Sequence, residues 1–214
     1  MNFCTLKEAS TAEIVEKKSR FIANSCHIES KEEAEKKINL IKKKYYDAKH
    51  NCFAFSVVDK EGNVLEKSSD DGEPSGTAGA PILNVIRKNN LNNVLIVVTR
   101  YFGGILLGTG GLTRAYSNAA LASIENGKII EVENGLQASI EIEYSENEKF
   151  KYYCDKNNIK IVETEYSENI IQKIELNEEE YNKLISKNME INRQLPFKIK
   201  QIGIICRKFV EKAQ

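Results

Sequence analysis

Two glycine-rich segments contain the residues whose types and spacing could do chemistry. The first, residues 70–79, reads Asp-Asp-Gly-Glu-Pro-Ser-Gly-Thr-Ala-Gly, and the second, residues 100–114, begins and ends with arginine. Nine of the twelve glycines in the chain lie between Gly62 and Gly111. Glycine loses more backbone freedom on folding than other residues, so this density indicates backbone that turns tightly or approaches something closely.

The second segment predicts an anion-binding site. From residue 74 to residue 124 there is no carboxylate, and the charged side chains are Arg87, Lys88, Arg100 and Arg114. The Gly-Thr-Gly-Gly run at 108–111 stands immediately before a predicted helix, where free N–H groups attract anions, and arginine can bind phosphate in a bidentate manner. A tight strand-to-helix turn is the alternative explanation of these glycines. The candidate anion-binding or RNA-binding residues are Arg100, Tyr101, Gly103, Gly104, Gly108, Thr109, Gly110, Gly111 and Arg114.

Known nucleotide-binding patterns do not fit these glycines. The run lacks the final Gly-Lys-Ser/Thr of a P-loop, and Thr113 occupies the third glycine position of a dinucleotide fingerprint. The four residues 76–79 have the G-x-x-G form of an RNA-clamping loop but lack the basic residues typical of one.

The first segment supplies carboxylates and hydroxyls for a polar cluster. Asp70, Asp71 and Glu73 could hold Mg²⁺, although an Asp-Gly pair followed by proline is also typical of a turn. His50 lies two residues before Cys52, so both side chains share one face of a strand, as a catalytic pair or as structural residues. The candidate polar-cluster residues are Arg20, His50, Asp71, Glu73, Ser75 and Thr77. We expect no catalytic residue, no metal and no cofactor.

Hydrophobic periodicity predicts the elements that position both segments. Residues 20–28 and 91–99 have strand patterns, and the second run is apolar enough for a central strand. Ser30 caps a predicted helix with Ala34 and Ile38 on its apolar face, and lysines on its polar face that either bind phosphate or are only solvated. A further helix over residues 112–126 ends at Gly127.

The carboxy-terminal part is predicted to form a ferredoxin-like domain. Apolar and polar residues alternate over 136–144, a capping box is expected at residues 145–148, and Asn177 caps a second helix. The order β-α-β-β-α-β matches a ferredoxin-like sandwich. Asn134-Gly135 is a turn signal, so we expect an α+β protein with domains at residues 1–134 and 135–214.

Composition restricts the class of protein. The 214 residues include 31 basic and 31 acidic side chains, and this balance argues against a globally basic nucleic-acid clamp. No apolar run approaches the about 18 residues that span a bilayer, and the first ten residues lack a signal-peptide pattern. The five cysteines are widely spaced without a C-x-x-C motif, which predicts reduced thiols in the cytoplasm.

Five motifs in order resemble the Impact/YigZ family. They lie at residues 18–22, 47–52, 70–79, 100–104 and 108–112, and the resemblance covers about residues 15–125 strongly. It implies an amino-terminal domain with a fold similar to the second domain of a small-subunit ribosomal protein and to part of elongation factor G. It also implies a carboxy-terminal ferredoxin-like domain that resembles the late domains of that factor.

The resemblance implies a function in translation. Eukaryotic Impact competes for the activator of a kinase that phosphorylates an initiation factor, and it acts by binding and not as an enzyme. We therefore expect a non-enzymatic, translation-associated protein that contacts RNA, the ribosome or a translation-related protein, and no membrane. Two alternatives stay open. One is a small-molecule phosphate- or nucleotide-binding protein, or an enzyme, that uses the same segment, and the other is a protein-binding scaffold that uses the free sheet face of the second domain.

Overall fold

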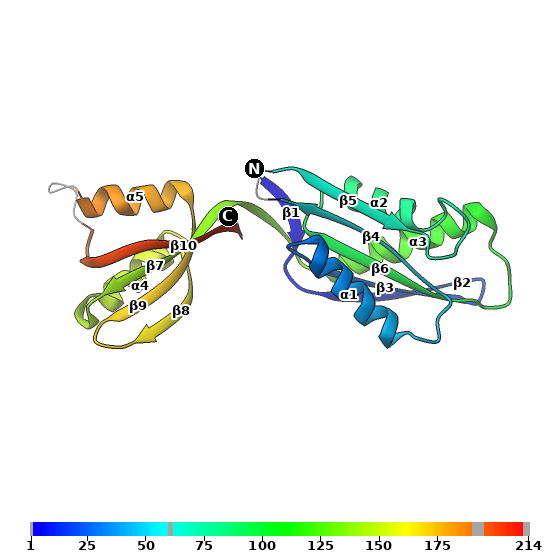
Figure 1. Ribbon diagram of the computed structural model, residues 1–214, viewed down its shortest axis with the longest axis horizontal. Coiled ribbons are helices and arrows are strands. Elements are labelled where there is room, and N and C mark those ends of the chain that lie inside the picture. The colour runs from blue at the N-terminus through cyan, green and yellow to red at the C-terminus, as the bar shows by residue number, and fades with distance from the viewer. Residues whose placement is uncertain (1, 60–61, 190–194, 212–214) are drawn as a thin grey trace. The chain divides into compact units, whose positions relative to one another are not determined.

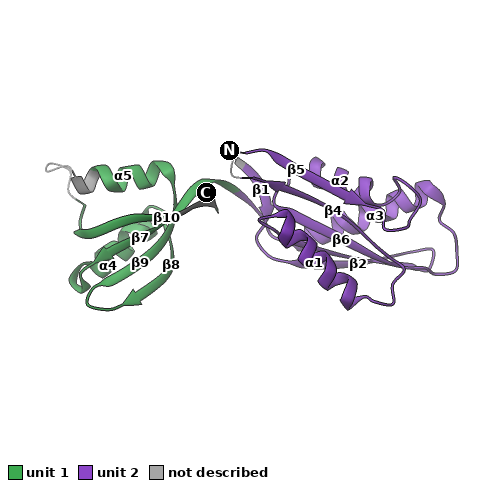
Figure 2. Ribbon diagram, viewed as in Figure 1, with its two compact units in different colours: residues 1–2, 132–214 green, residues 3–131 purple. Residues whose placement is uncertain are grey.

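The protein, seen here as a computed structural model that describes residues 2–59, 62–189 and 195–211, folds as two compact units (Figures 1 and 2). The amino-terminal unit contains residues 3–131, and the carboxy-terminal unit contains residues 1–2 and 132–214. Both units combine helices with an antiparallel sheet, which confirms the predicted α+β class. Among the described residues, no helix combines the length and the apolar character needed to cross a membrane.

The amino-terminal unit is built on a five-stranded antiparallel sheet in the order β2-β3-β6-β4-β5. The strands are β2 (Ser10–Glu16), β3 (Ser19–His27), β4 (His50–Val58), β5 (Val64–Ser69) and β6 (Val94–Tyr101). Every residue of β6 except Tyr101 is buried. This burial explains the continuous apolar run in the sequence and confirms the predicted central strand.

Helices cover both faces of this sheet (Figure 1). Helix α1 (Lys31–Lys44) packs on the face that carries Leu95 and Val97. Helices α2 (Gly79–Lys88) and α3 (Gly108–Asn126) pack on the opposite face, against Ile96 and Val98. The alternation of β6 side chains therefore places two separate apolar cores on the two sides of one sheet.

The predicted helix ends in this unit are confirmed by hydrogen bonds. The Glu33 N–H donates to Ser30 Oγ at 3.1 Å at the start of α1, and the Gly127 N–H donates to the Ile124 carbonyl at 3.0 Å at the end of α3. The sequence patterns did not indicate α2, β2 or the short β1 (Asn2–Leu6), which pairs with β7 (Ile129–Ile142).

The carboxy-terminal unit has the predicted β-α-β-β-α-β order. Strands β10, β7, β9 and β8 lie side by side in that order, and the two helices contribute Phe150, Cys154 and Leu184 to the core. This is the strand order of a ferredoxin-like sandwich. Besides β7, the elements are α4 (Asn147–Lys156), β8 (Lys160–Tyr166), β9 (Ile170–Asn177), α5 (Glu178–Met189) and β10 (Ile199–Glu211).

Two local predictions in this unit are wrong. Asn134-Gly135 does not form a turn, because it lies inside β7, where Gly135 pairs with Asn177 of β9. The capping box at residues 145–148 does not form either: a turn of 3₁₀ helix (Tyr144–Glu146) precedes α4, and no side chain caps that helix. The Asn177 cap of α5 is confirmed, since its Oδ1 accepts from the Glu180 N–H at 2.9 Å.

Candidate functional site

The site is organised by one row of residues across three neighbouring strands. In the sheet register, Arg100 of β6 lies opposite Phe21 of β3 and opposite His50 of β4. Residues opposite one another in an antiparallel pair point to the same face. The register therefore places all three side chains on the face that α2 and α3 cover. Cys52, two residues after His50 in β4, points to the same face.

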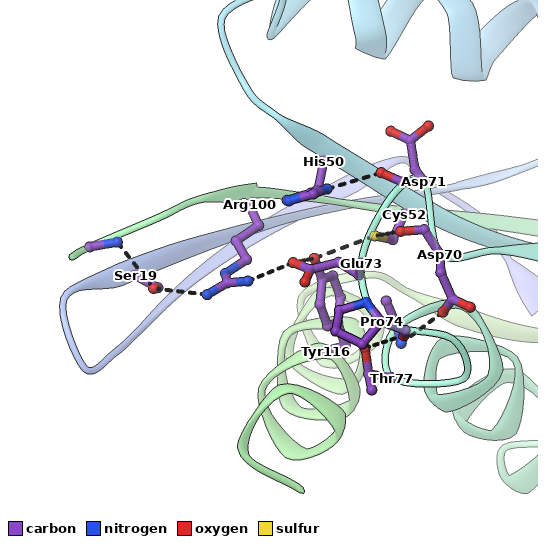
Figure 3. A network of polar contacts seen from close by, with 12 residues as sticks. Ser19, His50, Cys52, Asp70, Asp71, Glu73, Pro74, Thr77, Arg100 and Tyr116 are labelled. Atoms are coloured by element: carbon purple, nitrogen blue, oxygen red, sulfur yellow. Dashed lines mark hydrogen bonds and ion pairs between the residues drawn. The ribbon is translucent and has the colours of Figure 1, made fainter. Parts of the chain in front are cut away.

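Arg100 and Glu73 form a buried ion pair at the centre of this row (Figure 3). Arg100 Nη1 donates to Glu73 Oε1 at 2.7 Å, and the two side chains are 7% and 3% exposed. Tyr116 of α3 donates its hydroxyl to the same carboxylate oxygen at 2.9 Å. The rings of Phe21 and Phe102 lie 5.5 and 5.6 Å from the guanidinium carbon. Charge pairing and cation–π contacts together accommodate a cation that has left water.

A thiol and a phenol extend the network toward the first glycine-rich segment. Cys52 Sγ donates to the Asp70 carbonyl at 2.9 Å and lies 3.4 Å from Tyr116 Oη. Burial raises the pKa of the Cys52 thiol to about 12. Burial also raises the pKa of Tyr116, and its neighbours Cys52 and Glu73 act in the same direction. Both groups are therefore protonated at neutral pH, and neither supplies a ready nucleophile or base.

The Asp70 carboxylate organises the loop that leads into α2. Asp70 Oδ1 accepts from the Ala78 and Gly79 N–H groups at 3.0 and 2.8 Å, and Oδ2 accepts from the Gly76 N–H at 2.8 Å. Partial burial raises the pKa of Asp70, but these three donors outweigh it and the net pKa is lowered. The protein's own carboxylate thus binds three of the four N–H groups of the G-x-x-G sequence, and the fourth, that of Thr77, donates to the Pro74 carbonyl.

The neighbouring Asp71 joins this loop to α1 and β4. Its carboxylate accepts from Lys42 Nζ and from the Asn51 N–H, each at 2.7 Å, and His50 Nδ1 lies 3.0 Å from its carbonyl oxygen. The three carboxylates of the first segment therefore bind three different sets of donors. Within the part of the chain that the structure describes, no group of three or more His, Cys, Asp and Glu residues is arranged to hold a metal ion.

The other predicted polar-cluster residues lie in different surroundings. Arg20 is exposed, pairs with Glu13 at 2.8 Å and lies over the ring of Tyr101, whose hydroxyl donates to Asp47 at 2.7 Å. Ser75 is exposed. Thr77 is buried, and its hydroxyl donates to the Pro74 carbonyl at 2.7 Å. The structure therefore brings Glu73, His50 and Thr77 to the side of the sheet that α2 and α3 cover. The Asp71 carboxylate instead binds Lys42 of α1, and Arg20 and Ser75 lie outside the network.

Ser19 connects the buried network to the surface. Its hydroxyl oxygen lies 3.5 Å from Arg100 Nη2 and accepts from the Gly103 N–H at 3.2 Å. A Cβ atom on Gly103 would overlap the backbone of Lys18 and Ser19, so this close approach requires glycine. Gly104 follows with φ of +84°, in the left-handed region that also favours glycine. The glycines thus attach an exposed loop, residues 102–107, to the turn between β2 and β3.

The Gly-Thr-Gly-Gly run lies in the first turn of α3 and does not precede it. Gly108, Thr109 and Gly110 are exposed, no side chain caps the helix start, and no acidic residue lies in its first turn. Arg114, in the second turn, is also exposed, whereas Arg100 is buried against Glu73. The structure does not place the two arginines together at one surface.

Ser19 and Tyr116 are the members of the network that sequence reasoning missed. Ser19 stands inside a motif that carried the family resemblance, so it could have been considered. Tyr116 belongs to the apolar stripe of α3, and nothing in that pattern indicates the role of its hydroxyl. On α1, Lys42 binds Asp71, and Lys37 donates to the His27 carbonyl at 2.7 Å, so part of the basic face stabilises the fold.

Comparison with known proteins identifies the family. The Impact N-terminal domain model matches residues 17–124, and a domain of unknown function, DUF1949, matches residues 140–187. The IMPACT family member YvyE of Bacillus subtilis is 40% identical over 177 residues, which cover 72% of this chain and 81% of YvyE. The IMPACT family member YigZ of Escherichia coli is 42% identical over 100 residues, 47% of this chain and 49% of YigZ. A crystal structure of a hypothetical protein shares the fold with a TM-score of 0.63 at 24% identity and covers all of this chain and 98% of its own. The chain belongs to the Impact/YigZ family.

Proposed function

We propose that this protein is a non-enzymatic, translation-associated regulatory protein that acts by binding. One observation carries the proposal: Arg100 of the second glycine-rich segment binds Glu73 of the first, and residues 102–107 are held at the surface beside this pair. Glu73, Arg100 and Tyr116 are buried together, so they are not available to a substrate. Phe102 and Leu106 are 57% and 82% exposed. Exposed apolar side chains on a supported loop are typical of a contact surface.

The link to translation rests on the family. Membership of the Impact/YigZ family supports a regulatory role in translation, because the eukaryotic Impact proteins that the motifs resemble regulate translation by binding. We assign the contact with RNA, the ribosome or a translation-related protein to the end of the sheet where the 102–107 loop and the start of α3 lie. Gly108, Thr109, Gly110, Gly111 and Arg114 contribute to it from α3.

Cosedimentation with ribosomes and ribosomal subunits tests this function. We expect the protein to pellet with ribosomes at low salt, and the Phe102→Ala and Arg114→Ala variants to pellet less. Leu40→Ala is the matched control, because Leu40 is also exposed but lies on α1, across the sheet from α3. Translation extracts programmed with a reporter message should respond to the wild type and not to Phe102→Ala. Absence of binding and of any effect on translation would contradict the proposal.

A phosphate-binding function is the second candidate, and the start of α3 supports it. Its N–H groups are uncapped, and Cβ atoms on Gly108 and Gly110 would meet no atom within 4 Å. Such a helix start attracts anions. Nucleotides and phosphorylated metabolites would raise the melting temperature if one of them binds there. A raised melting temperature that Arg114→Ala abolishes, together with no binding to ribosomes, would favour this candidate over the first.

A further inference from the structure

The 102–107 loop is a supported apolar surface. Phe102, Ile105 and Leu106 are exposed large apolar residues within five positions of the chain. The guanidinium carbon of the buried Arg100 lies 5.6 Å from the centre of the Phe102 ring, and the Gly103 N–H donates to Ser19 Oγ. A loop held in this way loses little conformational entropy when a partner binds.

Three cations lie on the segments that adjoin this apolar loop. The backbone of Lys18 lies directly against Gly103, so the turn that carries Lys17 and Lys18 adjoins the loop, with Glu16 as its acidic neighbour. Arg114 lies on α3, which begins where the loop ends. Lys17, Lys18 and Arg114 make no ion pair within the described ranges. The uncapped start of α3 adds the positive end of a helix dipole.

We propose that the 102–107 loop and these three cations form a docking surface for an acidic, apolar segment of a partner protein. The inference rests on the proposed function and names its partner class. Leu and Phe side chains of the partner pack on Phe102, Ile105 and Leu106, while its carboxylates face the cations. Two of the three exposed apolar side chains are aliphatic, which suits a protein partner, because single-stranded RNA binds through aromatic stacking and many phosphate contacts. The formal net charge of zero also favours a protein partner, because binding to RNA depends on many basic contacts with phosphates.

Three fluorescent probes test the partner class by anisotropy. The first is a short amphipathic peptide with leucines on one helical face and glutamates on the other. The second has lysines in place of the glutamates, and the third is a single-stranded oligouridine RNA. We expect the glutamate peptide to bind about tenfold more tightly than the lysine peptide at low salt, and to lose a few-fold in affinity at high salt.

Variants locate the binding. Phe102→Ala and Leu106→Ala should each lower the affinity for the glutamate peptide by about fivefold or more. The double variant Lys17→Glu, Lys18→Glu should reverse the preference between the two peptides. Leu40→Ala and Lys36→Glu are the matched controls, since both residues are exposed on α1. Unchanged melting temperatures would show that all variants fold, and backbone NMR shifts caused by the glutamate peptide should concentrate at residues 14–18 and 102–114.

The outcomes separate the inference from the function on which it rests. Equal binding of the two peptides, or equal effects of the loop and control variants, would overturn the docking surface. Oligouridine binding that Phe102→Ala weakens, without peptide binding, would overturn the partner class and leave the proposed function standing. Failure of all three probes together with failure to bind ribosomes would overturn both.

Discussion

The guanidinium of Arg100 and the carboxylate of Glu73, 27 residues apart in the chain, meet at 2.7 Å in a region where both side chains are more than nine-tenths buried. Each charge is the other's ion-pair partner among the described residues. Tyr116 donates to the same Glu73 oxygen, Ser19 Oγ lies 3.5 Å from Arg100 Nη2, and Arg100 Nε is buried without a hydrogen-bond partner. The pair joins β6 to the first glycine-rich segment, and through Tyr116 it also joins α3. Its contribution can be measured against an exposed pair of the same chemistry.

Glu73→Gln should destabilise the protein by about 3–5 kcal/mol, because the buried Arg100 cation then lacks a counterion. Urea denaturation followed by circular dichroism gives the free energy of unfolding. Glu13→Gln is the control: Glu13 binds Arg20 at 2.8 Å on the surface, and its removal should change that free energy by about 1 kcal/mol or less. Similar effects of the two substitutions would show that the buried pair does not stabilise the fold.

Asp70→Asn should weaken the loop before α2. The amide oxygen can still accept from Ala78 and Gly79, but the amide nitrogen would face the Gly76 N–H, donor against donor. We expect a loss of about 1–3 kcal/mol at neutral pH.

The same substitution should remove part of the acid sensitivity. The folded pKa of Asp70 is lowered, so its contribution is complete above the unfolded value of about 4 and is lost as the pH falls through the folded pKa. The difference in unfolding free energy between wild type and Asp70→Asn should therefore shrink below about pH 4. A difference that stays constant with pH would contradict this assignment.

Cys52 and Cys154 should react with thiol reagents far more slowly than Cys4. Both are fully buried, and burial raises the pKa of each thiol to about 12, so little thiolate is present at neutral pH. Peptide mapping after timed alkylation should give rates more than about a hundredfold below that of the partly exposed Cys4. Urea should remove the difference in alkylation rate. Comparable rates in the native protein would contradict the buried positions of Cys52 and Cys154.

Gly103→Ala and Gly110→Ala should change stability in opposite directions. A Cβ on Gly103 overlaps the backbone of Lys18 and Ser19, and we expect a loss of about 3 kcal/mol or more. A Cβ on Gly110 meets nothing within 4 Å inside α3, so alanine should add about 0.5–1 kcal/mol through helix propensity. The free energy of unfolding of each variant tests these expectations. Destabilisation by Gly110→Ala would contradict the finding that a Cβ at this position has open space around it. A stabilised Gly110→Ala variant with weaker ribosome binding would indicate that this glycine serves the contact surface.

The elements that were predictable are those whose periodicity reflects burial on one or two faces. Alternation along residues 136–142, the continuous apolar run of β6 and the Ser30 cap each follow from local chemistry. Helix α2 was missed because Gly79-Ala80-Pro81 opens it, and only Ile82, Val85 and Ile86 then mark its buried face. Strand β2 was missed because it lies at the sheet edge and buries only Ala12.

The charged residues of the network were identified from the sequence, but their partners were not. Asp70, Glu73 and Arg100 stand out by type in a glycine-rich context, whereas the pairing of Arg100 with Glu73 depends on the position of the loop over the sheet. From the sequence, Arg100 was predicted to be a cation that is free to bind an anion. A carboxylate 27 residues earlier already occupies it, and no local pattern indicates that distance in space.

The bridge from Ser19 through Arg100 and Glu73 to Tyr116 also determines when, during synthesis of the chain, the 102–107 loop can be fixed in place. Its members are spread over almost a hundred residues of chain, so no fragment made early in synthesis contains them all. Contacts of such long sequence separation form only after the intervening chain has collapsed. A nascent chain can therefore complete this bridge only once α3 has left the exit tunnel and packed on the sheet.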